Sequence, residues 1–411
     1  AFSSCIDLNE MIFEGDAPDF GENVFYNVNL TAYYPHDNST WTEEVMQDYG
    51  GTLTWNIYCS GVHNSASGTI TKEPTCTDPG EKTGICDLCG ASYGEKDTTN
   101  HDYDNGICPD CGAYEPAELN SDNVYEIGNA GQLLWFAELV NSTPAELLVD
   151  YSVEVDAKLT SDIDMTGLPW IPIGCYAMNG NSIISSGFGG TFDGCGHTVS
   201  GIDCTVTANG SSATVDSPRA SFFGRIYNAV IRNLMVEGSF TARYTGTSNN
   251  PTAYAAGIVG YAEGSAQNNI IENCGFIGTL SAEGKNMTQV GGIAGYCRAT
   301  LINCWSAATV ESNDIKNKYI GGLVGTSSSS STYENCYYDS TLCTLSASSE
   351  GDLTGVTGKT SAQFASGEVA YLLQGEQTQQ IWGQNIGTDE TPSFTGLPAP
   401  MPRWFIPTAA P

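Results

Sequence analysis

The first 70 residues alternate apolar and polar side chains in two stretches, residues 23–34 (NVFYNVNLTAYY) and residues 51–59 (GTLTWNIYC). Alternation with a period of two is typical of strands that bury one face. The pattern therefore predicts a small N-terminal β module over residues 1–70. Cys5 and Cys59 bracket this module, and we expect a disulfide between them to close it; the alternative is two buried thiols.

A period of three to four residues replaces this alternation at residues 130–142 and predicts a helix there. Asn129 and Gln132 stand where a capping box would begin it. One face of the predicted helix carries the apolar residues Leu133, Phe136, Ala137 and Val140. Short β-like runs punctuated by glycine follow, to about residue 345.

These later runs repeat a pattern in which G-[IL]-[VA]-G precedes an Asn-Cys step. Three copies occupy residues 257–280, 292–310 and 322–342, and a degenerate copy at residues 222–240 has Asn-Leu in place of Asn-Cys. Spacings of 36, 35 and 30 residues separate the shared glycines, which are Gly224, Gly260, Gly295 and Gly325. Variable spacing of this kind suits the coils of a solenoid with insertions on one side.

Alignment of the four copies on their asparagines produces columns of side chains. The first inward column holds Leu234, Cys274, Cys304 and Cys336, and the last one ends on Leu342. Parallel pairing would stack such strands about 4.8 Å apart. We therefore predict an all-β fold, a right-handed parallel β-helix. Its stacked cysteines are expected to be small buried hydrophobic residues, because three stacked thiols cannot all pair with each other.

The ends of a solenoid expose unpaired strand edges, so we expect capping helices at both. Residues 130–142 supply the first and residues 359–375 the second, with Thr360 and Gln363 as a capping box and Gly375 at the C-terminal end. The predicted organisation is a β module (1–70), a Cys-rich segment (71–117), the β-helix with its N-terminal capping helix (118–345), and a C-terminal capping helix with a Pro-rich tail (346–411).

The repeated units resemble the GLUG motif of bacterial surface adhesins and of non-catalytic parts of IgA-specific metallopeptidases. The stretches IGNAGQLLWFAELVN, GTFDGCGHTVSGI and FASGEVAYLLQG…IWGQNIGTDETPSF resemble the flanks of such repeats in gut-bacterial surface proteins. The resemblance covers roughly residues 123–394, and the copy at 222–240 departs from it by lacking the leading glycine. It implies a scaffold at the cell surface, and it implies no particular activity.

Charge narrows the classes of partner. The chain has 47 acidic against 14 basic residues and a formal net charge of -33. A polyanion would be repelled, so nucleic acid is excluded as a partner and anionic membrane surfaces are disfavoured. No apolar run approaches the ~20 residues that span a bilayer, so we expect no membrane insertion. Abundant Gly, Ser, Thr and Asn with little Lys favour an extracellular protein, secreted or at the cell surface.

The segment GICDLCGAS (84–92) has a near-copy, GICPDCGAY (106–114). Two C-x2-C pairs separated by eighteen residues predict a structural zinc site at Cys86, Cys89, Cys108 and Cys111. Glycines after each pair would let backbone N–H groups face the thiolates. The segment also resembles the zinc-ribbon-like inserts of surface proteins from anaerobes.

Two residues near these pairs leave alternatives open. Cys76 has no place in a four-cysteine site and favours the oxidised alternative, in which the cysteines pair as disulfides. His101 lies between the two pairs and could replace one cysteine as a ligand.

Catalytic signatures are sparse, and we predict that the protein is not an enzyme. The sequence contains no HExxH motif and only four histidines. Asp162, Asp164 and Asp193 are the candidate carboxylates for a polysaccharide-cleaving β-helix enzyme, which is one alternative, or for calcium, which is another.

A binding surface is a stronger expectation than an active site. Trp305 and Tyr337 fall in one outward column of adjacent coils and would form an aromatic pair for a glycan or for a host or neighbouring surface protein. The alternative is that another segment of the chain covers them. Five sequons could carry glycans, at Asn29, Asn38, Asn141, Asn209 and Asn286.

The Pro-rich tail has an apolar centre, Trp404, Phe405 and Ile406, which could anchor a neighbouring copy. The alternative is that the tail is a linker towards a cell-wall anchor. The sequence thus predicts a non-catalytic extracellular surface protein acting as an adhesive or structural stalk. A self-assembling subunit of an extracellular filament is the alternative, with copies of itself as partners.

Overall fold

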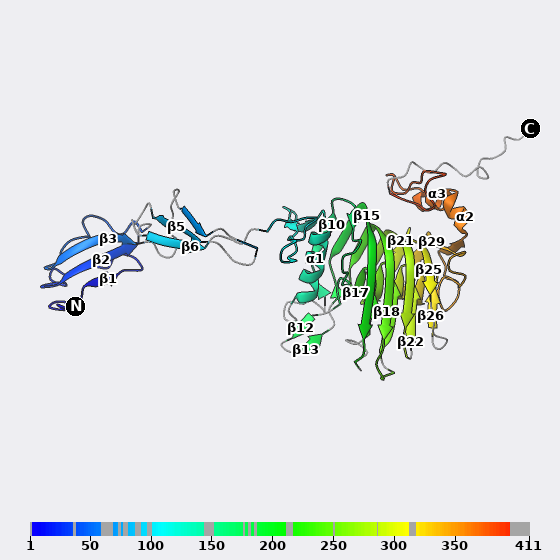
Figure 1. The fold of residues 1–411 in the computed structure, drawn as a ribbon, viewed down its shortest axis with the longest axis horizontal. Helices are drawn as coiled ribbons and strands as arrows, with labels where there is room; N and C mark the ends of the chain where they lie inside the picture. The colour runs from blue at the N-terminus through cyan, green and yellow to red at the C-terminus, as the bar shows by residue number, and fades with distance from the viewer. Residues whose placement is uncertain are drawn as a thin grey trace, which may run out of the picture. The chain divides into compact units, whose positions relative to one another are not determined.

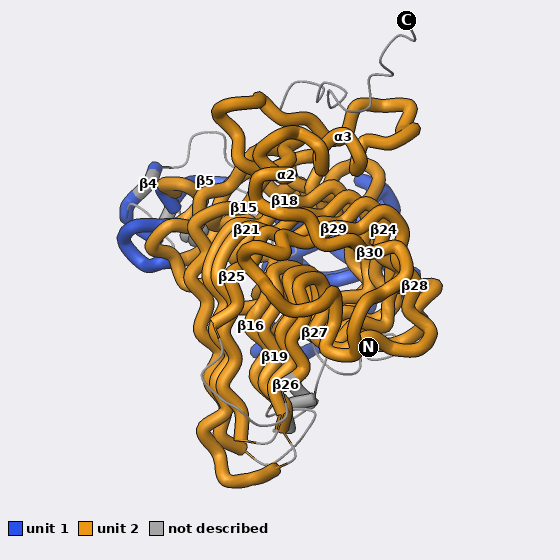
Figure 2. Tube along the Cα trace, turned by 90° about the vertical axis from the view of Figure 1, so that its right-hand side faces the viewer, with its two compact units in different colours: residues 1–102, 108–112 blue, residues 103–107, 113–411 orange. Residues whose placement is uncertain are grey.

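The computed structural model describes residues 2–35, 38–58, 69–72, 75–76, 81–86, 92–96, 101–143, 152–175, 177–179, 182–184, 187–210, 217–249, 251–285, 287–311 and 318–394. The chain divides into two compact units, residues 1–102 with 108–112 and residues 103–107 with 113–411 (Figure 2). In both, strands make up most of the regular secondary structure that is described. None of the helices in the described ranges has the length and apolar character needed to cross a membrane.

The first unit begins with a three-stranded parallel sheet, β1 (Glu10–Ile12), β2 (Asn29–Pro35) and β3 (Thr52–Tyr58). β2 and β3 lie within the two stretches that the alternating pattern predicted. The side chains facing the core are Phe25, Val28, Leu30, Ala32 and Leu53. Cys5 is exposed and has a free thiol, and Cys59 lies outside the described residues, so the structure gives no support to the predicted disulfide between them.

A three-stranded antiparallel sheet follows in the same unit, within the Cys-rich segment. Its strands are β4 (Thr69–Lys72), β5 (Glu81–Ile85) and β6 (Ser92–Lys96). These strands separate the loops in which the cysteines of this segment lie.

The second unit contains three sheets in which nearly all strand pairs are parallel (Figure 1). The largest has twelve strands: β7 (Glu118–Leu119), β8 (Val124–Ile127), β10 (Asp156–Leu159), β11 (Ile163–Asp164), β15 (Thr191–Ala208), β18 (Val230–Tyr244), β21 (Ile270–Glu283), β24 (Thr300–Ile302), β25 (Trp305–Glu311), β28 (Thr332–Glu334), β29 (Cys336–Asp339) and β30 (Val356–Lys359). The second has β9 (Ser152–Val153), β14 (Gly187–Phe188), β17 (Phe223–Tyr227), β20 (Val259–Glu263), β23 (Ala294–Cys297) and β27 (Val324–Ser327). The third has β16 (Arg219–Ala220), β19 (Thr252–Ala256), β22 (Met287–Gly291) and β26 (Lys318–Gly321). A separate hairpin joins β12 (Ala177–Asn179) to β13 (Ser182–Ile184).

The chain visits the three sheets in a fixed order. From β16 onward it passes from the third sheet to the second and then to the largest, and it does so four times in succession. Each pass pairs in parallel with the one before it, so that β18, β21 and β25 lie side by side (Figure 1).

The strand register matches the columns that the sequence predicted. Leu234 pairs with Cys274, and Gly275 pairs with Trp305, which in turn pairs with Tyr337. The first predicted inward column lies in the main core, whereas the outward neighbours Met235, Trp305 and Tyr337 form a separate cluster. The prediction is wrong at Leu342, which is 43% exposed because β29 already ends at Asp339.

The leading glycine of each repeat has a steric reason. A Cβ atom at Gly257 would collide with the Phe276 ring, and one at Gly322 would collide with the Tyr338 ring. Both rings belong to an inward column of the same pass, so the glycine leaves room for the core side chain opposite. In the degenerate copy, Ser221 takes the position of the leading glycine and Val236 takes the position of these rings.

Helix α1 (Ala130–Ser142) begins where predicted, with the Asn129 side chain accepting from the Gln132 N–H. Its buried face contributes Leu133, Phe136 and Val140 to the main core. The capping box is altered, because the Gln132 side chain accepts from the N–H of Gly128.

The second predicted helix is two short helices, α2 (Ser361–Ala365) and α3 (Glu368–Gln374). Gly367 separates them with a φ of 83°, a conformation that a helix interior excludes. The capping box of Thr360 and Gln363 is present. Both helices pack on the outward face of the largest sheet, while β30 pairs with β29 at its edge.

Candidate metal centre

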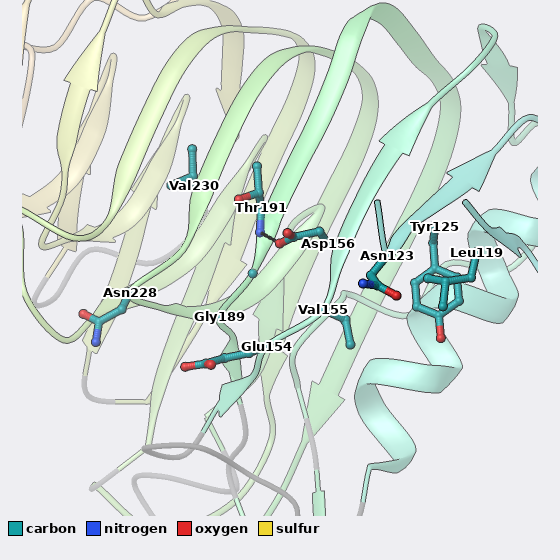
Figure 3. Close-up of a pocket in the computed structure, with 11 residues that line it drawn as sticks. Leu119, Asn123, Tyr125, Glu154, Val155, Asp156, Gly189, Thr191, Asn228 and Val230 are labelled. Carbon is teal, nitrogen blue, oxygen red and sulfur yellow. Dashed lines mark hydrogen bonds between the residues drawn. The ribbon is translucent and has the colours of Figure 1, made fainter. Parts of the chain in front are cut away.

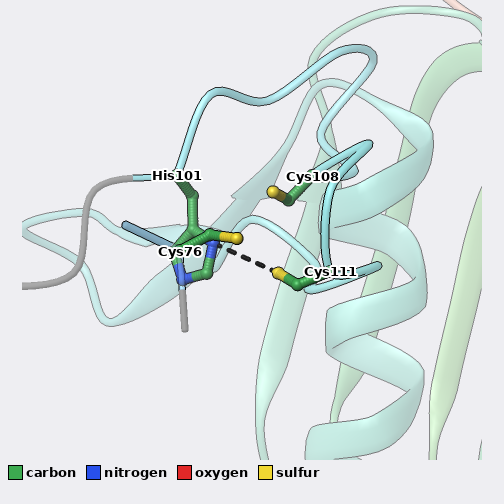
Figure 4. A group of neighbouring side chains, drawn as sticks. All are labelled: Cys76, His101, Cys108 and Cys111. Atoms are coloured by element: carbon green, nitrogen blue, oxygen red, sulfur yellow. Dashed lines mark hydrogen bonds between the residues drawn. The ribbon is translucent and has the colours of Figure 1, made fainter. Parts of the chain in front are cut away.

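Four potential metal ligands converge in the first unit: Cys76, His101, Cys108 and Cys111 (Figure 4). Their ligand atoms all lie within 4.8 Å of one another, and the Cys111 sulfur is 3.5 Å from Nδ1 of His101. Cys76 comes from the loop between β4 and β5, His101 follows β6, and the two other cysteines share one turn. Three loops thus bring together three sulfur atoms and one imidazole.

The turn at residues 108–112 presents backbone N–H groups to a sulfur. The N–H groups of Asp110 and Cys111 hydrogen-bond to the Cys108 sulfur, and the N–H of Gly112 donates to the Cys108 carbonyl at 2.8 Å. Gly112 has a φ of 76°, which suits glycine at the end of such a turn. This is the arrangement expected for a C-x2-C pair that holds a metal.

The thiols of this group interact strongly. The hydrogen bond with His101 lowers the pKa of Cys108 to about 6, burial opposes this shift, and the two backbone N–H groups add to it. Burial and the neighbouring thiols Cys111 and Cys108 raise the pKa of Cys76 to about 11. Closely spaced thiolates repel one another, so full deprotonation of the group needs a cation between the sulfurs.

The described group overlaps with the predicted ligand set, and it includes His101, which the sequence offered as a replacement for one cysteine. Cys108 and Cys111 belong to it as predicted. Cys86 is buried, but its sulfur is not among the four converging atoms, and Cys89 lies outside the described residues. The oxidised alternative finds no support, since no described cysteine forms a disulfide.

The predicted aromatic binding surface is wrong. Trp305 is fully buried and Tyr337 is 8% exposed, because the C-terminal segment lies over them. Phe364 of α2 and Trp382 contact the Trp305 ring at centroid distances of 5.7 and 6.3 Å. The alternative interpretation, that the chain covers this column itself, is the one the structure supports.

The three candidate carboxylates are held by protein donors. Asp162 accepts from the Thr198 N–H and lies 3.2 Å from His197 Nδ1. Asp164 accepts from both the N–H and the hydroxyl of Thr166, which lowers its pKa. Across the described ranges, only the Cys76 group brings three or more metal-ligating side chains together, and these aspartates are not part of it.

Asp193 begins a ladder of side-chain amides that the sequence analysis missed. The amide of Asn233 donates to Asp193 at 3.0 Å, and Asn273, Asn303 and Asn335 each donate to the preceding asparagine at 3.1, 3.2 and 2.8 Å. The last amide also donates to the Leu372 carbonyl of α3. All four asparagines have φ values of 50–52°. Asparagine tolerates this left-handed conformation better than most residues, which explains its recurrence.

The predicted sequons differ in accessibility. Asn29 and Asn209 are exposed, and Asn38 is half-buried. Asn141 is engaged on both sides of its amide: it donates to the Pro172 carbonyl and accepts from the N–H groups of Gly174 and Cys175. It is therefore unsuited to glycosylation in the folded state. Asn286 lies outside the described residues, as do Trp404, Phe405 and Ile406, so the assembly role of the tail stays a prediction.

The second unit has an open groove of about 540 Å³ beside β8, β10 and β15 (Figure 3). Its lining includes the carboxylates Glu154 and Asp156. Asp156 accepts from the Thr191 N–H at 2.6 Å and so belongs to the scaffold. The groove therefore has two carboxylates in its lining, one of which is held by a backbone N–H group.

No protein-family model and no curated protein matches the chain. A solved structure described as "a putative immunoglobulin A1 protease from Bacteroides ovatus" is similar at 21% identity with a TM-score of 0.42, over 69% of this chain and 96% of that chain. At that TM-score the likeness carries no argument about the fold or the function of this protein.

Proposed function

We propose that the protein is a non-catalytic extracellular surface protein that acts as an adhesive or structural stalk. Its second unit would be a right-handed parallel β-helix of the GLUG type, and its first unit would carry a zinc-ribbon-like segment. The regular succession of three parallel sheets supports the β-helix, since each pass supplies one layer of a stacked core.

The observation that carries the scaffold role is the amide ladder. Polar residues that repeat from pass to pass are candidates for a binding or catalytic row. Here the side chains form one continuous chain of hydrogen bonds, through Asn233, Asn273, Asn303 and Asn335. The chain begins at Asp193 and ends at a backbone carbonyl of α3. Their side chains therefore hold the passes in register, which is the work of a stalk.

Zinc is the metal that best fits the group of three cysteines and one histidine. Tetrahedral zinc places thiolate sulfurs about 3.8 Å apart, and the four ligand atoms already lie within 4.8 Å of one another. Four protein ligands would fill the coordination sphere and leave no position for water. The zinc would then be structural, and it would fix loops that have few apolar contacts of their own.

A panel of polysaccharides incubated with the full-length protein tests the non-catalytic role. We expect retention of one or more glycans on the immobilised protein and no release of shorter fragments. Fragment release that Asp193→Asn abolishes would contradict the proposal and favour a polysaccharide-cleaving enzyme. Lys158→Gln is the matched control, because its surface ion pair with Glu126 contributes little.

A further inference from the structure

Arg298 differs from three other arginines in the described ranges, because each of those three pairs with a carboxylate and Arg298 does not. Arg225, Arg232 and Arg243 each pair with a carboxylate, at 2.7, 2.8 and 3.6 Å. In the part of the chain that the structure describes, the Arg298 guanidinium has one partner, the Tyr296 hydroxyl at 3.4 Å, and no carboxylate. With 47 acidic residues for 14 basic ones, an arginine without an acid is informative. Its remaining donors are available to an anion.

Arg298 lines an open groove of about 450 Å³ at the turns that follow β20, β23 and β27. Apart from Gln267, small and hydroxyl-bearing residues form the rest of its lining, among them Ser265, Ser328 and Ser330. No acidic side chain is among the residues that line it. The groove therefore combines one cation with several hydroxyl groups, in a chain whose overall charge is strongly negative.

Two stacked tyrosine rings adjoin Arg298, whose guanidinium lies 3.4 Å from the Tyr296 hydroxyl. Tyr261 of β20 and Tyr296 of β23 occupy the same register position in adjacent passes, and their rings stack at 4.9 Å with an interplanar angle of 20°. Both side chains are half-buried. The Arg219 guanidinium lies 5.5 Å from the centre of the Tyr261 ring and adds positive charge. Stacked rings with one exposed portion suit the apolar face of a sugar.

We propose that this groove binds a carboxylate-bearing sugar of a glycan. The Arg298 guanidinium would hold the carboxylate through paired hydrogen bonds, the serine hydroxyls would bond to sugar hydroxyls, and Tyr296 would support the ring. This inference rests on the proposed adhesive role and names its ligand class. It also moves the binding surface from the covered Trp305 face of the largest sheet to the second sheet.

Isothermal titration calorimetry of the full chain tests this with three probes. Sialyllactose carries a terminal acidic sugar, hexagalacturonate carries internal ones, and lactose is neutral. We expect binding of one or both acidic probes and none of lactose. The acidic probe that binds identifies the source of the carboxylate.

Arg298→Gln should weaken binding at least about tenfold, the loss expected for a charge-assisted hydrogen-bonded pair. Arg298→Lys should be intermediate, since it keeps the charge but loses the planar fork. Arg243→Gln, at an exposed arginine paired with Glu283, is the matched control and should bind as the wild type does. An unchanged unfolding midpoint for each variant shows that the fold is intact.

Binding of neither acidic probe overturns the inference. So does equal binding by the wild type and Arg298→Gln, or equal binding of acetylated triglutamate, which would indicate a peptide carboxylate. If neither acidic probe binds while the wild type and Arg298→Gln retain the same neutral glycan equally, the adhesive role stands and this site falls.

Discussion

Two sets of closely spaced cysteines in this protein have opposite environments. In the first unit, Cys108 receives backbone N–H groups and a hydrogen bond with His101, and its pKa falls to about 6. In the second unit, Cys274, Cys304 and Cys336 are fully buried, and burial raises the pKa of the last two well above the ordinary value. The same side chain is a candidate metal ligand in one place and a small buried hydrophobic residue in the other.

The difference lies in what each sulfur faces. The stacked thiols face carbonyl oxygens of the preceding pass and of their own pass, as in the 3.3 Å contacts from Cys304 to Ile271 and Ile302. An S–H group can donate to a carbonyl, whereas a thiolate there would be repelled. Proximity of sulfur atoms therefore does not define a metal site; the polarity of the groups around them does.

The largest expected effect comes from replacing a cysteine of the candidate metal site in the first unit. Cys108→Ser should abolish stoichiometric zinc binding and remove a contribution on the order of 10 kcal/mol to folding of the surrounding loops. Elemental analysis and amide hydrogen exchange of residues 101–112 measure the two consequences. Cys195→Ser, at an exposed cysteine of the second unit, should change neither. Unchanged zinc content in Cys108→Ser would remove Cys108 from the site.

Alkaline pH should act on the buried cysteines of the second unit. Burial raises the pKa of both Cys175 and Cys204 to about 12, from an ordinary value near 9. Because the folded pKa is the higher one, the stability that these thiols contribute is complete below pH 9 and is lost as the pH rises towards 12.

At pH 10.5 the loss should be about 2 kcal/mol for each of these two thiols. Urea unfolding of the second unit at pH 8 and pH 10.5 measures it, and Cys175→Ala should reduce the dependence on pH. A midpoint that rises with pH would contradict the burial of these groups as neutral thiols.

A smaller effect is expected at the centre of the stacked column. Cys304→Ser should lower the free energy of unfolding by about 1–3 kcal/mol, because a hydroxyl is costlier to bury than a thiol. Cys195→Ser makes the same chemical change at an exposed position and should cost less than about 0.5 kcal/mol. Equal destabilisation by both substitutions would show that the column does not face the core.

The register of the second unit could be predicted because its information is local. Alternation with a period of two sets the inward columns, and the asparagines align one pass with the next. The sequence also contained a sign of the amide ladder, because asparagine recurs at one aligned position of every pass. Coverage of Trp305 by the chain itself was one of the alternatives, but the covering segment could not be predicted, because Phe364 and Trp382 are far away in the sequence and only the folded chain brings them to that face.

The metal-ligand set was predicted only in part, again because the sequence does not report contacts between distant segments. Spacing identifies a C-x2-C pair as a turn that can hold metal, and Cys108 and Cys111 form such a turn. Spacing cannot say which other side chains meet that turn. Cys76 and His101 come from loops on either side of β5 and β6, and the path of these loops decides their meeting with the pair.

X-ray absorption at the zinc edge of the full-length protein, purified without added metal, tests the account most directly. We predict about one zinc per chain with three sulfur ligands and one nitrogen ligand, from Cys76, Cys108, Cys111 and His101. Four sulfur ligands and no nitrogen would contradict this ligand set and restore the set of two C-x2-C pairs. Absence of zinc together with oxidised cysteines would contradict the metal centre itself.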